Sequence, residues 1–238
     1  MRVSEKAIVL QVIKLGDKKC MLKLYTSHHG TLSAVTHVGH APSSKVKASS
    51  VLPLSLIDAE LIIKQNREVQ QLTEASCYYV SSGVSSSIVK LGIAQFLNEI
   101  LIRTLKEQGA NVHLYEFIET CLKFLNDTDA PVNLHLYFMA ELTKYLGFEP
   151  QNNFGGEALY FDCREGSFSP VSLSMPLGLN KEDSLLFSEF LKTRSLETRI
   201  SNAQRGALLD SLLAYYRLHV PGFNEIRSLD VLREVMTG

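Results

Sequence analysis

The chain has 238 residues, a hydrophobic fraction of 45%, a charged fraction of 21% and a formal net charge of −1. These values are typical of a globular protein with a sizeable core, and the net charge alone indicates no polyanionic partner. No apolar run approaches the length of a membrane span, and charge follows the short apolar stretch near the N-terminus at once, so we expect a cytoplasmic protein without a signal peptide.

The first eighty residues read as short β-strands separated by turn signals. Turn residues join the strands at Gly16-Asp17, at Gly30 and at Asn66-Arg67. The expected strands are 6–16, 18–26, 31–39, 51–65 and 68–76. Five short strands in this arrangement predict a small closed or nearly closed barrel.

A serine- and glycine-rich break at 81–87 precedes a change of hydrophobic periodicity from two to about 3.6. Ser86 or Ser87 is expected to cap the first helix. A third helix is expected to begin near Pro131 and to end at Gly147. The first two helices are predicted by two apolar stripes: Ile93, Phe96, Leu97, Ile100, Leu101 and Leu105, and then Leu114, Phe117, Ile118, Cys121, Leu122 and Leu125.

Residues 150–180 lose this periodicity, and we expect loops there with a small hairpin around 158–169. Helical patterns return at 182–192 and at 201–220, and Ser228 is expected to cap a last short helix. We therefore predict an α+β chain. Its domains are a five-stranded barrel at 1–80 and a mainly α-helical domain at 81–238, with an irregular or hairpin insert around 150–180.

The stretch THVGHAPSSKVKASS at 36–50 contains serine, lysine and histidine but no acid. This composition suits either a phosphate-binding loop or a plain polar connection. A P-loop reads G-x-x-x-x-G-K-[ST]. If Gly39 is the first glycine, Ser44 stands where the second glycine is required and Val46 where Ser or Thr is required. Only Gly39 and Lys45 fit the pattern. The run that follows is also strand-like, and we interpret the stretch as a loop between strands.

Neither the cysteines nor the histidines form a metal-binding pattern, and we predict no metal and no cofactor. The cysteines lie far apart without a CxxC pair, which is typical of reduced, half-buried thiols: Cys20, Cys77, Cys121 and Cys163. Several histidines of the N-terminal third are expected to be exposed in turns, where protonation would add positive charge near about pH 6: His28, His29, His37 and His40.

No nucleophile elbow, HExxH motif or paired-carboxylate signature is present, so we predict that the protein is not an enzyme. Residues 1–80 hold ten Lys and Arg against six Asp and Glu, a net charge of +4, and residues 81–238 hold fourteen against nineteen, a net charge of −5. A small barrel with basic loops is a common platform for single-stranded nucleic acid, and Tyr25 offers an aromatic ring for stacking. Lysines can equally keep an exposed strand edge soluble, so both interpretations stay open.

Ordered segments along nearly the whole chain resemble the RecO family of DNA repair and recombination proteins. The N-terminal match is KAIVLQVIKLGDKKCMLKLYTSHHGTLSAVTHVG at 6–39, followed by 43–64 and 69–76. The helical match comprises KLGIAQFLNEILIRTLKEQGANVHLYEFIETCLKFL and NLHLYFMAELTKYLGFEP, and then ALYFDCREGSF and LLAYYRLHVPGFNEIRSLDVLREV. The resemblance implies an oligonucleotide/oligosaccharide-binding (OB) barrel followed by a helical domain.

The resemblance also implies a role as a recombination mediator associated with the nucleoid. Such proteins bind single- and double-stranded DNA and anneal complementary strands. They contact the C-terminal tail of single-strand-binding protein. With RecR, and often RecF, they help to load RecA onto coated DNA.

Two departures from the family pattern carry consequences. Many members have a four-cysteine zinc site after the LGF motif, whereas this chain has only Cys163 there, so we predict no zinc and a hairpin held by packing. The loop after the third strand often carries several arginines and lysines in the family, but here it reads GHAPSSKVK. Fewer cations displace fewer counterions, so we expect weaker DNA binding with a shallower salt dependence.

The expected DNA contacts come from the basic loops and strand surface of the barrel: Lys14, Lys18, Lys19, Lys23, Lys45, Lys47 and Arg67. The tail of single-strand-binding protein is typically acidic and ends in an apolar residue with a free carboxylate, so its site should pair an apolar pocket with a cation. The helical half offers Arg103, Lys144 and Arg205 for this role, although each could be an ordinary helix-surface cation. The alternative function is a protein-binding adaptor with little direct DNA affinity, and an unrecognised hydrolase would require a nucleophile–base pair that the sequence does not indicate.

Overall fold

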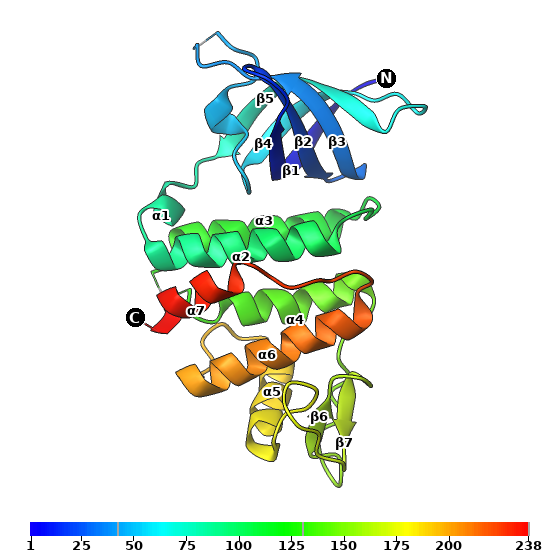
Figure 1. The fold of residues 1–238 in the computed structure, drawn as a ribbon, viewed down its shortest axis with the longest axis vertical. Coiled ribbons are helices and arrows are strands. Elements are labelled where there is room, and N and C mark those ends of the chain that lie inside the picture. Colours follow the sequence, from blue (N-terminus) through cyan, green and yellow to red (C-terminus); the bar gives the residue numbers. More distant parts are fainter. Residues whose placement is uncertain (42, 130, 238) are drawn as a thin grey trace. The chain divides into compact units, whose positions relative to one another are not determined.

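The computed structural model describes residues 1–41, 43–129 and 131–237. The strands of the N-terminal part are β1 (Arg2–Lys14), β2 (Lys19–Thr26), β3 (Gly30–His37), β4 (Leu56–Ile62) and β5 (Val69–Tyr79). Within the described residues they close a barrel in the order β1-β2-β3-β5-β4, in which β3 and β5 are parallel and the other neighbours antiparallel. The prediction of a five-stranded OB-type barrel is confirmed, and Figure 1 draws it in blue to cyan.

The fourth strand begins later than expected from the run 51–65. The Ser55 amide donates to the Leu52 carbonyl at 3.0 Å, which closes a turn, and Leu54 has a left-handed φ of 64°. Left-handed backbone interrupts an extended strand, so pairing starts only at Leu56.

Helices dominate from residue 82 onward. Ser87, one of the two expected caps, accepts a hydrogen bond from the Lys90 amide. Gly147 ends the third long helix at a φ of 83°, as expected, but this helix begins at Leu134 because Pro131–Asn133 form a turn. The elements are α1 (Ser82–Ser85), α2 (Ile88–Thr104), α3 (Val112–Asp127), α4 (Leu134–Leu146), β6 (Tyr160–Asp162), β7 (Ser167–Ser169), α5 (Lys181–Thr193), α6 (Asn202–His219) and α7 (Leu229–Thr237).

The chain divides into two compact units, Met1–Asp127 and Thr128–Gly238. Strands give way to helices after Tyr79, near the expected boundary at 80, but α1, α2 and α3 belong to the same compact unit as the barrel. The boundary at 80 as a limit of independent domains therefore stays a prediction.

The start of β3 holds the barrel against the α2–α3 loop. The Thr31 amide donates to the Gln108 carbonyl at 2.9 Å, and its hydroxyl donates to the Leu105 carbonyl at 2.7 Å. Gly30 has a φ of 67°, and a Cβ there would lie 2.3 Å from the Gln108 oxygen. Only glycine permits so close an approach of the two backbones.

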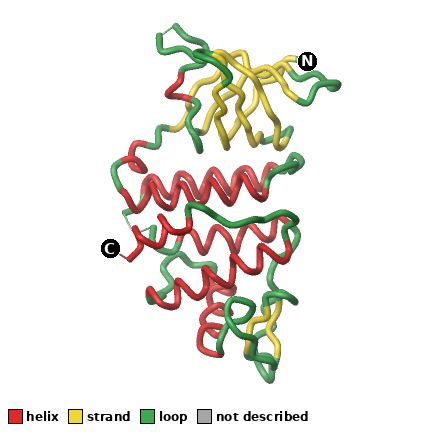
Figure 2. The backbone as a smooth tube through the Cα atoms, viewed as in Figure 1, coloured by secondary structure: helices red, strands yellow, loops and turns green. Residues whose placement is uncertain are grey.

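In the second unit, α4 packs against α6, and the short hairpin of β6 and β7 lies beside α5, as the yellow strands of Figure 2 show. The hairpin was predicted around 158–169, and its paired residues are Tyr160–Asp162 and Ser167–Ser169. Among the described residues, no helix is both long enough and apolar enough to span a membrane.

Candidate nucleic-acid interface

The outer face of β1, β2 and β3 combines lysines with apolar side chains. Side chains alternate along β2, so Leu22 is buried in the barrel core whereas its neighbours Met21 and Lys23 lie on the outer face. The outward side chains form three cross-strand rows: Lys19–His37, Ile13–Met21–Val35 and Gln11–Lys23–Ser33. An apolar row therefore lies between two rows that each carry a lysine.

A groove between β3 and the β4–β5 turn brings three cations together. Lys19, Lys64 and Arg67 line it together with His37. Its volume of about 220 Å³ is below the roughly 300–1,000 Å³ of small-molecule pockets, so it suits a polymer backbone better than an enclosed nucleotide. Lys64 was absent from the candidate set, although its place in the same turn as Arg67 was a usable signal.

Gln70 fixes the backbone of this turn. Its side-chain oxygen accepts from the Lys64 amide at 2.8 Å, and its side-chain nitrogen donates to the carbonyls of Lys64 at 3.3 Å and Arg67 at 2.6 Å. The two cationic side chains consequently extend from a fixed backbone, which lowers the entropic cost of ordering them on a phosphate chain.

The loop that carries Lys45 and Lys47 is anchored by Val46, which is 2% exposed in the barrel core. The Ala75 amide donates to the Lys45 carbonyl at 3.0 Å, and the Gly39 amide donates to the Val46 carbonyl at 2.9 Å. Because neighbours in an extended segment point to opposite sides, both lysines are exposed while Val46 is buried. Pro42 of the same loop lies outside the described residues.

The seven candidate DNA contacts do not form one cluster. In Figure 1 the connection between β3 and β4 lies at the upper left of the barrel, and the β4–β5 turn projects at the upper right. Lys14 lies opposite Cys20 in the β1–β2 pair, and the Cys20 side chain belongs to the barrel core. Lys14 therefore does not belong to the cross-strand rows of the outer face. Lys18 precedes β2, and its carbonyl accepts from the Val38 amide at 2.8 Å.

Tyr25 is not available for stacking on bases, and that expectation is wrong. Its side chain is 0% exposed, and its ring centroid lies 6.4 Å from that of Tyr115 on α3. Burial raises the pKa of the Tyr25 hydroxyl to about 12. The residue therefore packs the barrel against α3.

A buried carboxylate organises the turn between β2 and β3. Glu5 is 6% exposed and accepts from the Ser27 hydroxyl at 3.0 Å and the His28 amide at 3.2 Å. Nδ1 of His29 lies 2.7 Å from the second carboxylate oxygen. The two histidines are exposed, as predicted, but their acidic partner was missed. The sequence signal for this partner was strand alternation: Glu5 lies two residues before the inward-facing Ala7, so the two side chains share the inner face.

The three cations suggested for a partner tail lie on different helices. Arg103 is on α2 and lies 3.3 Å from Glu99, and Lys144 is on α4 and lies 2.9 Å from Glu141. Arg205 is on α6 and belongs to the second unit, whereas Arg103 belongs to the first. They therefore remain three separate candidates.

Arg205 borders a small cavity with an apolar wall. Leu209, Leu232 and Met236 line this cavity, and Arg233 on α7 supplies a second guanidinium. The Arg205 guanidinium donates to Asn202 Oδ1 at 2.7 Å and to the Ile200 carbonyl at 3.1 Å. The cavity thus combines aliphatic surface with two guanidinium groups, of which that of Arg233 is paired with the Asp210 carboxylate.

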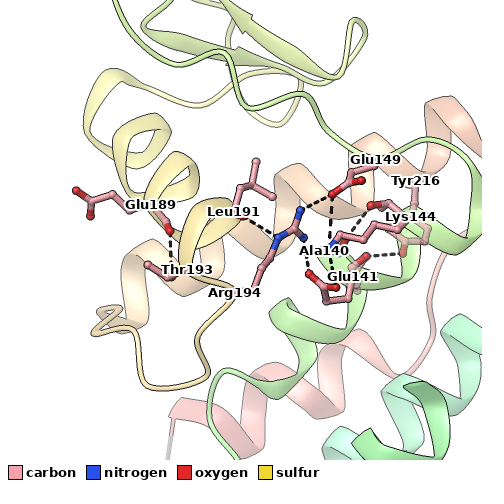
Figure 3. Close-up of polar contacts among 11 residues, drawn as sticks. Ala140, Glu141, Lys144, Glu149, Glu189, Leu191, Thr193, Arg194 and Tyr216 are labelled. Atoms are coloured by element: carbon pink, nitrogen blue, oxygen red, sulfur yellow. Dashed lines mark hydrogen bonds and ion pairs between the residues drawn. The ribbon is translucent and has the colours of Figure 1, made fainter. Parts of the chain in front are cut away.

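Lys144 belongs to a network of charges between α4 and the end of α5 (Figure 3). Arg194 Nη2 lies 2.7 Å from Glu149, and its Nη1 lies 2.8 Å from Glu141 without hydrogen-bond geometry. Arg194 Nε also donates to the Leu191 carbonyl at 2.8 Å. Lys144 Nζ lies 2.9 Å from Glu141 and 3.9 Å from Glu149, so two carboxylates offset its charge and weaken its attraction for an acidic peptide.

The residues near the hairpin do not fit the zinc site that many members of the resembled family carry. Zinc is bound by thiolates, and burial beside Asp162 raises the pKa of the Cys163 thiol to about 12. Cys163 Sγ donates instead to the carbonyls of Pro176 and Ser211, each at 3.4 Å. Within the described residues, no group of His, Cys, Asp and Glu side chains is arranged to hold a metal ion.

Comparison with known proteins links the chain to one family. The model described as "Recombination protein O N terminal" matches residues 1–80, and "Recombination protein O C terminal" matches residues 85–229. The chain is 30% identical to DNA repair protein RecO of Flavobacterium psychrophilum over 100% of both chains, and 30% identical to that of Phocaeicola vulgatus over 97% of both. It is 29% identical to DNA repair protein RecO of Porphyromonas gingivalis over 98% of both chains.

Proposed function

The chain belongs to the RecO family of DNA repair proteins, and on that premise we propose that it is a non-enzymatic recombination mediator. In this proposal it binds single- and double-stranded DNA in the cytoplasm, at the nucleoid, and anneals complementary strands. With RecR and RecF it helps to load RecA onto DNA coated by single-strand-binding protein.

The observation that supports direct DNA binding most strongly is the groove of Lys19, Lys64 and Arg67 beside the outer face of β1–β3. Cations at fixed positions bind phosphates without reading sequence. The apolar row of Ile13, Met21 and Val35 offers a hydrophobic surface against which the faces of the bases can pack. A DNA strand held in this way is extended and its base edges are accessible to a complementary strand. Annealing then requires no catalytic group.

A fluorescent oligothymidine titrated at two salt concentrations tests this role. We expect binding that weakens with salt, and we expect Lys19→Glu and Arg67→Glu each to lower the salt slope by about 0.7 for a single strand. Lys181→Glu, which reverses an exposed cation on α5, is the matched control and should leave the slope unchanged. Absence of binding at low salt would overturn the proposal and favour the adaptor function.

For the tail of single-strand-binding protein we propose the cavity bordered by Arg205 and Arg233. Its volume of about 70 Å³ admits only part of a terminal apolar side chain against the aliphatic wall, and the Arg205 guanidinium at its border suits a free carboxylate. An acidic peptide that ends in an apolar residue should bind when its C-terminus is free, and about tenfold or more weakly when that terminus is amidated, because a charge-assisted contact is lost. Equal affinities for the two peptides would rule this site out, and the comparison needs no protein variant.

A further inference from the structure

An apolar groove in the first unit lies apart from the basic surface described above. It is bordered by the turn at 52–55, the end of β5, the segment 80–85 and the helices α2 and α3. Its volume is about 520 Å³, which is within the range of roughly 300–1,000 Å³ found for ligand sites. Among the described residues that line it, none is charged, and the polar ones are serines apart from the thiol of Cys77 and the hydroxyl of Tyr79.

Large aliphatic side chains are exposed to solvent at the rim of this groove. Leu52 is 57% exposed, Val80 is 72% exposed and Leu91 is 46% exposed. Ile88, 72% exposed, precedes Leu91 by three residues and lies on the same face of α2. Exposed apolar surface gathered in one place, and not scattered singly, is typical of an interaction site.

The groove also contains an incompletely paired strand edge. On one side β5 pairs with β4 as far as Tyr79. On the other side it pairs with β3 at Val69–Gln71 and with the loop at Ala75. Among the described residues, pairing on that second side reaches no farther than Ala75. Beyond it the Cys77 thiol donates to the Tyr79 carbonyl at 2.9 Å, and the side chains of both residues line the groove.

We propose that this groove binds an extended, uncharged, aliphatic segment of a partner protein, which adds to the edge of β5 beyond Ala75. Strand addition satisfies the backbone groups of both chains and places alternate side chains in pockets. A charged segment would lose its hydration without gaining a partner, because the lining carries no opposite charge. A helical segment would leave the strand edge unpaired. The inference does not depend on DNA binding.

Cys77 provides a built-in reporter of occupancy. Its side chain is half-buried in the groove, whereas Cys20, Cys121 and Cys163 are buried. We would alkylate the full chain with N-ethylmaleimide and measure the rate of Cys77 modification by mass spectrometry. The reaction would be run with and without a pentapeptide of alternating serine, valine and leucine whose two ends are capped. At about ten times its Kd the peptide should slow the reaction of Cys77 about tenfold, because only about a tenth of the sites stay open.

Variants then locate the site. Leu52→Ser and Leu91→Ser remove exposed side chains, and each should weaken peptide binding about tenfold through the lost apolar contact. Leu218→Ser is the matched control, because Leu218 is 50% exposed but lies on α6 in the second unit. A peptide with lysine in place of leucine should give no protection of Cys77.

Several results would overturn the proposal. Unchanged alkylation at millimolar peptide would exclude a peptide site, and equal protection by the lysine peptide would exclude selection for an uncharged segment. Protection by an oligonucleotide alone would assign the groove to nucleic acid. Protection that rises with protein concentration in the absence of peptide would assign it to a second copy of the chain.

Discussion

The imidazole of His135 lies on the first turn of α4 and is 1% exposed. Burial lowers the pKa of His135 to about 3, and the nearby charge of Arg205 acts in the same direction. The folded pKa is thus below the unfolded value of about 6.5, so the unfolded chain binds the extra proton first as the pH falls. The stability that neutral His135 contributes is complete above about pH 6.5 and is lost progressively from there down to about pH 3.

We therefore predict that His135→Gln flattens the acid side of the stability profile. Between about pH 6 and pH 4 the wild-type chain should lose up to about 1.4 kcal/mol per pH unit from this group, and the variant should not. Urea denaturation at a series of pH values measures the slopes. Parallel profiles for the two proteins would show that His135 does not couple folding to protons, whatever the substitution costs at pH 7.

Tyr25 and Val46 illustrate what the sequence could and could not predict at single positions. Strand alternation accounts for the burial of Ala34 inside the barrel and for the position of the β2 lysines on its outside. It could not predict that Tyr25, on the outside, is covered by Tyr115, because that contact joins residues 90 positions apart. Val46 was treated as part of a polar loop, since one valine among serines and lysines has no periodic signal to mark it as core.

At the scale of elements, the end of α5 is joined to α4 by the charges of Arg194, Glu141, Lys144 and Glu149 (Figure 3). The side chains of Arg194 and Glu141 are 18% and 11% exposed, so each is poorly hydrated without the other. Arg194→Met should destabilise the chain by roughly 2 kcal/mol, less than a fully buried pair would, because Lys144 still faces Glu141.

Lys144→Met is the comparison for this element. The Lys144 side chain is 38% exposed, so its removal should cost less than about 1 kcal/mol. Urea denaturation of both variants tests the order. A larger loss for Lys144→Met than for Arg194→Met would contradict the assignment of Arg194 as the central cation.

The β6–β7 hairpin is packed by aromatic rings at the place where many family members carry zinc. Phe161 lies 5.3 Å from Phe168, 4.8 Å from Phe187 and 5.9 Å from Tyr215, measured between ring centroids. The sequence predicted the hairpin from its turn residues, but its packing partners on α5 and α6 required the tertiary fold.

Chelation should therefore leave the hairpin intact. We predict an unchanged Tm after dialysis against EDTA, and a loss of about 3–5 kcal/mol for Phe168→Ala, because a large buried ring is replaced by a cavity. Calorimetry of the purified chain, with metal content measured in parallel, provides the test. A Tm that falls on chelation and returns with zinc would show that other residues bind the metal.

At the scale of the whole molecule, charge is divided along the sequence. Residues 1–80 carry a net charge of +4, from ten cations and six acids, and residues 81–238 carry −5, from fourteen and nineteen. The near-zero total therefore conceals a cationic barrel, whose field attracts a polyanion while the rest of the chain repels it. The sequence predicted this division, but it could not separate the cations of the groove from those of the loop around Lys45.

That separation predicts a length-dependent salt effect. An oligothymidine of about 5 nucleotides can occupy the groove of Lys19 and Arg67, whereas one of about 15 can also reach the loop, since OB barrels contact roughly 4–16 nucleotides. The double variant Lys45→Glu/Lys47→Glu should lower the salt slope by about 1.4 for the longer strand and leave the shorter one unchanged. Fluorescence anisotropy over a salt series measures both slopes, with Arg67→Glu as the variant that should affect both lengths. An equal effect of the double variant on the two strands would mean that loop and groove form one continuous contact surface.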